Sequence, residues 1–203
     1  ILSDERQRNE SLVDMTNYLE FAESLYGADA YSKFYWSRKV SVNGKTYGLV
    51  GLNSAWRSFD SEKDRGQLLF PIVEVRNAFA DMNDCEMIFC AMHHDLSDFK
   101  NDIEDNMSQI LEKKCSILFT GHYHKCKTRY TYVDNKGFIH SIAPATYNRY
   151  DTGSQYGFVI LEISDDGTEL RELVNRYQDG VFSICKNDPI PIPMENEKRD
   201  FIK

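Results

Sequence analysis

The sequence predicts a mixed α/β fold over one domain or a little more, and three features of the chain support this class. Two apolar segments of strand length, EMIFCAM and CSILFTG, flank a segment with helical character, DFKNDIEDNMSQILEKK. Further along, turn residues separate pairs of segments rich in aromatic and β-branched residues, which indicates antiparallel hairpins. The 203 residues are 41% hydrophobic and 28% charged, as in ordinary globular domains that bury a core.

Residues 1–30 are expected to form a helical lead-in. Apolar side chains at positions 12, 15, 19, 22 and 25 recur every three or four residues, which is the spacing of an amphipathic helix, and Gly27 should end it. The main domain is expected over residues 31–178. It should open with a hairpin, because Asn43 and Gly44 separate KFYWSRKVSV from KTYGLVGLNSAW, and a two-residue hairpin turn favours Asn-Gly.

The centre of the domain should contain two helices and two buried strands. Pro71 suits the first turn of a helix, and apolar residues at helical spacing follow it. EMIFCAM and CSILFTG carry apolar residues on both faces, so each strand is expected to need cover on both sides of its sheet. The helix between them has an acidic start and a basic end, which complement its dipole.

The last part of the domain should consist of two successive antiparallel hairpins. The first pairs KTRYTYVD with GFIHSIA, and the second pairs YGFVILEIS with TELRELVNRY. Residues 179–203 are expected to be an extended and partly disordered tail, because prolines alternate within it and its end is charged.

Composition limits the functions that the chain can have. A net charge of -8 does not favour nucleic acid as a partner, and no apolar run approaches the roughly 20 residues of a membrane-spanning helix. The five cysteines are an odd number without a Cys-x-x-Cys pair. A reducing, cytoplasmic location is therefore expected.

Histidines gather at the ends of the two buried strands. His93 and His94 follow EMIFCAM, and His122 and His124 follow CSILFTG. Open sheets bind ligands at the carboxyl ends of their strands, and a spacing of two in an extended segment would turn His122 and His124 to the same side. His93, His122 and His124 are therefore candidate ligands of a transition metal such as Mn, Fe or Zn.

The remaining histidines have simpler interpretations. His140 alternates with apolar residues and is expected to be a buried side chain with its ring hydrogen-bonded. His94 has the same interpretation, or else it supports a metal ligand through a hydrogen bond. A mononuclear zinc site of three histidines, complete in itself, also stays open.

Two motifs resemble those of a known superfamily. ILFTGHYH resembles the Gly-His-x-His motif that closes the calcineurin-like metallophosphoesterase domain, and IFCAMHHDL resembles its preceding motif, an apolar strand followed by His-His-Pro. The resemblance covers roughly residues 35–165. It implies that the chain is the C-terminal half of a four-layer αββα sandwich with a mixed sheet and antiparallel hairpins.

The resemblance also implies a site for two metal ions, to which this chain contributes only part. His93 and His122 would bind one ion and His124 the other. The superfamily's other ligands lie in Asp-x-His, Gly-Asp-x-x-Asp and Gly-Asn-His motifs, which this sequence lacks. The N-terminal half of the domain is therefore expected from the same polypeptide or from a second chain, and the fragment alone should be inactive.

The implied reaction is hydrolysis of a phosphomonoester or phosphodiester by a water molecule that two metal ions activate. The superfamily spans protein phosphatases, nucleotide phosphodiesterases and nucleases, so the substrate stays open. Tyr123 and Arg149 are candidate substrate contacts. Asp95 stands where the superfamily has proline, and it either orients a metal-bound imidazole or opens a loop toward Leu96 and Asp98.

A different class of function also stays open. The chain could be an inactive remnant or a regulatory interaction module that keeps three histidines without a complete site. Upstream Asp-x-His, Gly-Asp-x-x-Asp and Gly-Asn-His motifs in the full coding region would distinguish the enzyme from this alternative.

Overall fold

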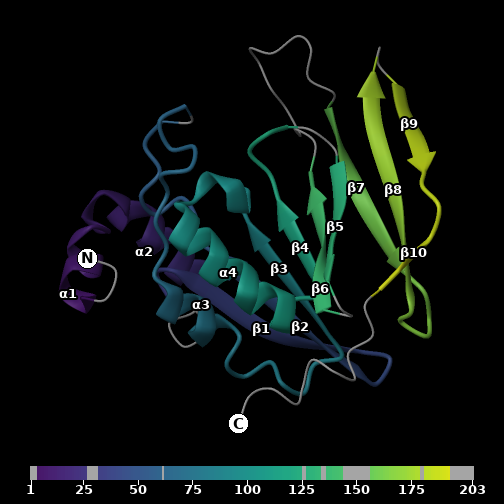
Figure 1. The fold of residues 1–203 in the computed structure, drawn as a ribbon, viewed down its shortest axis with the longest axis horizontal. Helices are drawn as coiled ribbons and strands as arrows, with labels where there is room; N and C mark the ends of the chain where they lie inside the picture. The colour runs from purple at the N-terminus through teal and green to yellow at the C-terminus, as the bar shows by residue number, and fades with distance from the viewer. Residues whose placement is uncertain are drawn as a thin grey trace.

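The computed structural model describes residues 4–26, 32–60, 62–124, 127–133, 136–143, 156–178 and 181–192. Its helices and strands form a mixed α/β architecture with two β-sheets (Figure 1), which confirms the predicted fold class. No helix in these segments is long and apolar enough to cross a membrane.

The N-terminal region contains two α-helices and a 3-10 helix where the sequence predicted one helix. The elements are α1 (Glu5–Glu10), the 3-10 helix η1 (Val13–Met15) and α2 (Thr16–Tyr26). Leu12 and Leu19 are buried in the main core, whereas Leu25 is exposed. Arg8 of α1 forms an ion pair with Glu74 at 3.4 Å, which ties this region to the domain that follows.

Six strands form the first sheet. In spatial order they are β1 (Tyr35–Val42), β2 (Lys45–Leu52), β3 (Met87–Met92), β4 (Ile117–Thr120), β6 (Lys136–Ile142) and β5 (Lys127–Val133). Strands β2, β3, β4 and β6 run parallel, while β1 and β5 pair antiparallel at the two edges. The carboxyl ends of the four parallel strands therefore meet along one edge of the sheet.

The predicted hairpin turn between β1 and β2 is confirmed. Asn43 and Gly44 have φ values of 51° and 78°, and Val42 pairs with Lys45 on either side of them. Both central residues of this kind of turn require positive φ, which asparagine and glycine tolerate better than other residues.

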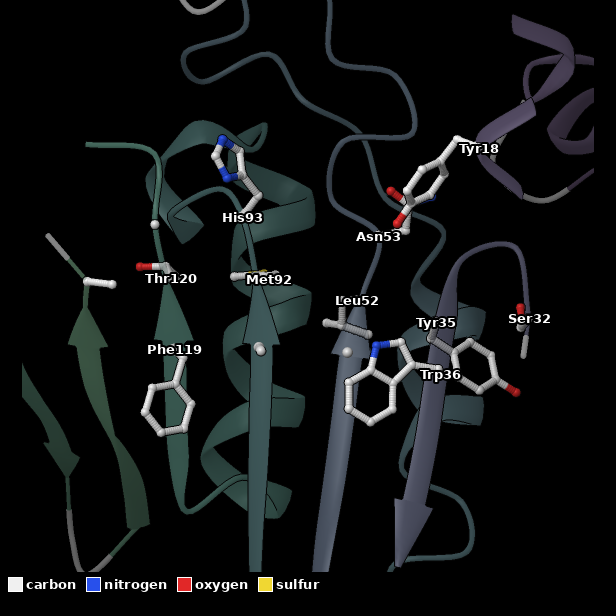
Figure 2. A pocket seen from close by; sticks show the side chains of 14 residues that line it. Tyr18, Ser32, Tyr35, Trp36, Leu52, Asn53, Met92, His93, Phe119 and Thr120 are labelled. Carbon is white, nitrogen blue, oxygen red and sulfur yellow. The ribbon is translucent and has the colours of Figure 1, made fainter. Parts of the chain in front are cut away.

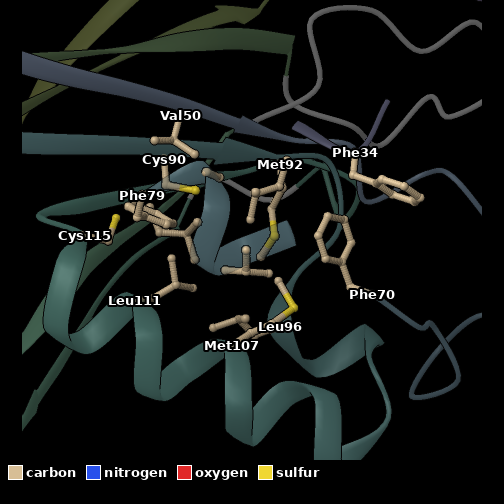
Figure 3. Packing of buried hydrophobic residues seen from close by; sticks show 14 of the residues in the cluster. Phe34, Val50, Phe70, Phe79, Cys90, Met92, Leu96, Met107, Leu111 and Cys115 are labelled. Atoms are coloured by element: carbon tan, nitrogen blue, oxygen red, sulfur yellow. The ribbon is translucent and has the colours of Figure 1, made fainter. Parts of the chain in front are cut away.

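Helices cover one face of the first sheet. They are α3 (Ile72–Ala78) and α4 (Asn101–Lys114), and Pro71 stands immediately before α3. Met107 and Leu111 of α4 are fully buried and belong to one core with Val50 and Cys90 of the sheet (Figure 3). The predicted strand, helix and strand at the centre of the domain are confirmed.

The second sheet covers part of the opposite face. It consists of β7 (Tyr156–Ile163), β8 (Glu169–Gln178), β9 (Val181–Lys186) and β10 (Ile190–Pro191), with β8 paired to all three others. Met87, Ile117 and Ile139 of the first sheet pack in one cluster with Leu170 and Ile192. Both predicted hairpins are confirmed, whereas β9 is a strand within the segment predicted to be a tail; residues 193–203 lie outside the described residues.

Cover over β3 is incomplete at its carboxyl end. Along the face that the second sheet covers, Met87 is buried and Phe89 half-buried, but Ala91 and His93 are exposed. The buried interface between the two sheets therefore stops before the end of the strand. This opening lies at the edge where the predicted metal ligands emerge.

Candidate metal site

Three loops leave the first sheet at neighbouring strand ends. Ser54 follows β2, His93 and His94 follow β3, and His122 follows β4 one residue beyond Gly121. Strands β3 and β4 are parallel neighbours, with Phe89 to Ala91 of β3 paired to Ile117 to Phe119 of β4. The two histidine clusters predicted at strand ends therefore emerge from adjacent strands of one sheet.

Hydrogen bonds hold these loops together. The backbone N–H groups of His93 and His94 both donate to Ser54 Oγ at 3.1 Å. The backbone N–H of Gly121 donates to the His93 carbonyl oxygen at 3.0 Å. The positions of the histidine backbones are thus fixed from the β2 side and from the β4 side.

Three histidines converge at this edge. One ring nitrogen each of His93, His94 and His122 lies within 4.8 Å of the others. His93 Nε2 and His122 Nδ1 are 3.2 Å apart. Two nitrogens that bind one tetrahedral ion at about 2.05 Å are about 3.3 Å apart, so this pair fits a single transition-metal ion.

His94 has a different environment from the other two. Its side chain is 2% exposed, with Nδ1 3.1 Å from Ser54 Oγ and Nε2 3.5 Å from Ser58 Oγ. Ser54 Oγ already accepts two backbone N–H groups, so its own proton is free to be donated to Nδ1. In that arrangement neither ring nitrogen of His94 offers a lone pair to an ion, and His94 acts as a support behind His93 and His122.

Ser58 connects His94 to a buried carboxylate, that of Asp64. Ser58 Oγ donates to Asp64 Oδ2 at 2.8 Å, and the backbone N–H groups of Phe59 and Asp60 donate to the same oxygen. Burial alone would raise the pKa of Asp64, but these hydrogen bonds lower it, so the carboxylate is charged at neutral pH. A chain of polar contacts therefore runs from His94 through Ser58 to Asp64.

The electrostatic environment favours neutral imidazoles. Burial lowers the pKa of His93, and the neighbouring His122 and His124 lower it further. Burial also lowers the pKa of His94 to about 4, with His93 and His122 adding to the shift. A neutral imidazole is the form that binds metal ions, so the lowered pKa of His93 favours its metal-binding form at neutral pH.

The stability of the protein without metal is expected to fall as the pH decreases from about 6.5 toward about 4. The pKa of His94 is lower in the folded chain than in the unfolded chain, so only the unfolded chain takes up a proton here over that range. Urea unfolding in EDTA at a series of pH values measures this effect. His94→Asn should flatten the profile over that range, and parallel profiles for the two proteins would contradict the expectation.

The turn after β4 differs from the sequence prediction. His122 and His124 have φ values of 63° and 53°, so the prediction that they lie in an extended segment is wrong. The backbone N–H of Tyr123 donates to the Gly121 carbonyl at 2.7 Å, which closes a tight turn centred on His122. His124 is exposed and lies outside the group formed by the other three histidines; its role as a ligand of a second ion stays a prediction.

The remaining candidate residues lie around the site. The Tyr123 hydroxyl donates to the Asp98 carboxylate, and burial followed by this contact raises the pKa of Tyr123. Asp95 Oδ1 accepts from the backbone N–H of Ser97 and caps the 3-10 helix η3 (Leu96–Asp98), in line with the loop-opening interpretation. Arg149 lies outside the described residues.

Behind this loop, the buried side chains of Asp95 and His140 lie close to each other. Asp95 Oδ2 lies 3.9 Å from His140 Nε2, and that nitrogen is 2.8 Å from Thr120 Oγ1. His140 is buried, as expected, and it is on β6 rather than in the histidine cluster.

Sequence reasoning missed the serines and the carboxylate that hold His94. Ser54 carried a usable signal, because it follows an apolar strand of the same sheet just as the histidines do. Ser58 and Asp64 carried none, since they lie in a loop whose path depends on tertiary contacts.

No protein-family model matches the chain. No curated protein matches it either. Solved structures similar to the chain include Vps29 proteins, which belong to the calcineurin-like metallophosphoesterase fold. A Vps29 double mutant from Entamoeba histolytica is 16% identical with a TM-score of 0.33, over 75% of this chain and 59% of that chain.

Two further structures have comparable scores. Wild-type Vps29 from Entamoeba histolytica, complexed with zinc, is 17% identical with a TM-score of 0.32, over 75% of this chain and 59% of that chain. A hypothetical protein from Thermus thermophilus is 13% identical with a TM-score of 0.40, over 83% of this chain and 66% of that chain. The chain thus spans less than two thirds of the length of these proteins.

Proposed function

We propose that this chain is part of a metal-dependent phosphoester hydrolase in which His93 and His122 hold an ion. The observation that carries the proposal is the 3.2 Å separation of His93 Nε2 and His122 Nδ1 at the carboxyl edge of a parallel sheet. A bound transition-metal ion would supply activation of water and stabilisation of negative charge on phosphate oxygens. Because both ligands are neutral, they leave the positive charge of the site available to a phosphate anion.

The finer parts of the proposal follow from the motif resemblance. His124 would contribute to a second ion, and both ions would be Mn, Fe or Zn. Further ligands, carboxylates among them, would come from an N-terminal half supplied by the same polypeptide or by a second chain. Tyr123 and Arg149 remain proposed substrate contacts, and a cytoplasmic location remains part of the proposal.

The test uses the complete polypeptide, expressed from its full coding region. We expect it to hydrolyse bis(p-nitrophenyl) phosphate when Mn²⁺ is added and to lose this activity in EDTA. The 203-residue chain by itself should bind metal ions without turnover. Turnover that persists in EDTA, or the lack of any metal binding in calorimetry, would reject the proposal.

One observation favours a second candidate, a regulatory or interaction module with a zinc site. Among the described residues, the metal-binding group consists of histidines alone, without a carboxylate. Measurement of metal content separates the candidates. One tightly bound zinc ion per complete polypeptide, together with no hydrolysis of phosphomonoesters or phosphodiesters, would favour the module over the enzyme.

A further inference from the structure

A cavity of about 350 Å³ opens beside His93 (Figure 2). It lies on the face of the first sheet that the second sheet covers only in part, beyond the end of that cover. Ligand pockets span roughly 300–1,000 Å³, so this volume suits one small molecule rather than a peptide. His93 and Thr120 line the end of the cavity nearest the metal site, and Asn53 lies near its opposite wall (Figure 2).

The floor of the cavity is a row of small residues between two aromatic side chains. Trp36 pairs with Gly51, Gly51 with Ala91, and Ala91 with Phe119, so these four residues lie side by side on four adjacent strands. Paired residues of neighbouring strands project to the same face, and Trp36 and Phe119 both line the cavity. Ala91 is exposed although it lies on an inner strand of the sheet.

Gly51 is required by the position of the Trp36 indole. A Cβ atom at Gly51 would lie 2.1 Å from Trp36 Nε1, far inside van der Waals contact. The indole therefore lies over β2, and the Phe119 ring projects from β4 (Figure 2). Ala91 is on β3 between them, paired with Gly51 and with Phe119. Strands β2 and β4 are two interstrand spacings apart, about 9.5 Å.

This spacing fits one flat ring above Ala91. Aromatic rings pack with their centroids about 4.5–7 Å apart, so a ring placed midway can contact both walls. Ala91 is on β3 and His93 follows the strand two residues later, so their Cα atoms are at most about 7 Å apart. A ring on Ala91 would thus be within a few atoms of a phosphate group at His93 and His122.

We propose that this cavity binds a planar aromatic ring carried by the phosphoester substrate, with Trp36 and Phe119 as walls and Ala91 as floor. The inference rests on the proposed hydrolase function and specifies its substrate class. The ring can belong to a nucleoside phosphate or to an aryl phosphate, because both present the same apolar planar surface to the cavity. The ring is held by stacking and burial, so it binds independently of the metal ion.

Titration calorimetry in EDTA measures the binding of ligands to the cavity. Metal ions are absent under these conditions, so no metal-dependent hydrolysis takes place. The probes are adenosine 5′-monophosphate and phenyl phosphate, compared with ribose 5-phosphate and inorganic phosphate on the same polypeptide. At least one aromatic probe should bind about tenfold tighter than the non-aromatic ones. Binding of the nucleotide alone, or of phenyl phosphate alone, would support the cavity and identify the source of the ring.

Two substitutions provide the structural control. The larger side chain of Ala91→Leu should occupy the space of the ring and weaken binding of the aromatic probe about tenfold or more. Ala80→Leu makes the same change at an exposed alanine after α3 and should leave the affinity unchanged. If Ala91→Leu does not fold, Trp36→Leu removes one wall instead and should weaken binding in the same way. Equal affinities for all probes, or an aromatic affinity unaffected by the folded cavity variant, would overturn the inference.

The binding experiment and the hydrolysis experiment can fail independently of each other. Selective binding of aromatic probes without metal-dependent turnover would support the cavity and count against the hydrolase. Turnover of bis(p-nitrophenyl) phosphate with no preference for aromatic probes would overturn the cavity and leave the hydrolase in place.

Discussion

Replacement of His122 by asparagine is expected to weaken metal binding by at least about 100-fold, since even residues that only support a ligand contribute 10- to 100-fold. The substitution removes the nitrogen that lies 3.2 Å from His93 Nε2. Asparagine tolerates positive φ, so the turn at φ 63° should be kept and only the imidazole lost. Calorimetric titration with Zn²⁺ or Mn²⁺ measures the change, and the hydrolysis rate of the complete polypeptide should fall in parallel.

His124→Asn is the matched comparison, because His124 has a similar φ of 53° and lies outside the three-histidine group. If His124 binds a second ion, its loss should reduce the number of ions bound and leave one site intact. If the site is mononuclear, the variant should behave as the parent protein. Unchanged metal affinity in His122→Asn would contradict the assignment of His122 as a ligand.

Replacement of Phe99 by alanine is expected to destabilise the folded chain by about 3–5 kcal/mol. Phe99 is 0% exposed, and its ring packs edge to face with Phe70 at 6.5 Å between centroids. The substitution leaves a cavity in the main hydrophobic core, to which Met107 and Leu111 of α4 also belong. Urea unfolding with detection by circular dichroism measures the free energy of unfolding.

Phe59→Ala is the control for the same change of side chain. Phe59 is 87% exposed, and its described ring contact is with Lys63 Nζ at 5.8 Å from the centroid. Its loss should change the free energy of unfolding by less than about 1 kcal/mol. Similar losses in the two variants would show that the structure around Phe99 is not the rigid core described above.

Local signals in the sequence were sufficient for much of the fold. The turn at Asn43 and Gly44 could be predicted because few residue pairs adopt positive φ twice in succession. The apolar strands β3 and β4 with helix α4 between them could be predicted from periodicity, and their adjacency follows from the rules for parallel strands. The meeting of His93 with His122 followed from that adjacency.

Tertiary contacts decided the parts that could not be predicted. The positive φ of His122 and His124 has no local signature, because histidine usually adopts negative φ. The place of His94 in the site depends on Ser58 and Asp64, which are brought to it by the loop after β2. Strand β9 was not predicted, because it lies in a segment assigned to an extended tail. It becomes a strand through its pairing with β8, a tertiary contact without a local signal.

The left-handed backbone at His122 and His124 also affects how this sequence can change over evolutionary time. A side chain in that conformation costs about 1–2 kcal/mol that glycine does not incur. Glycine at either position should therefore stabilise the fold, and a redesign guided only by folding energy would choose it. The positive φ values of 63° and 53° at His122 and His124 therefore cost folding free energy, and the proposed binding of metal ions by these histidines would offset that cost.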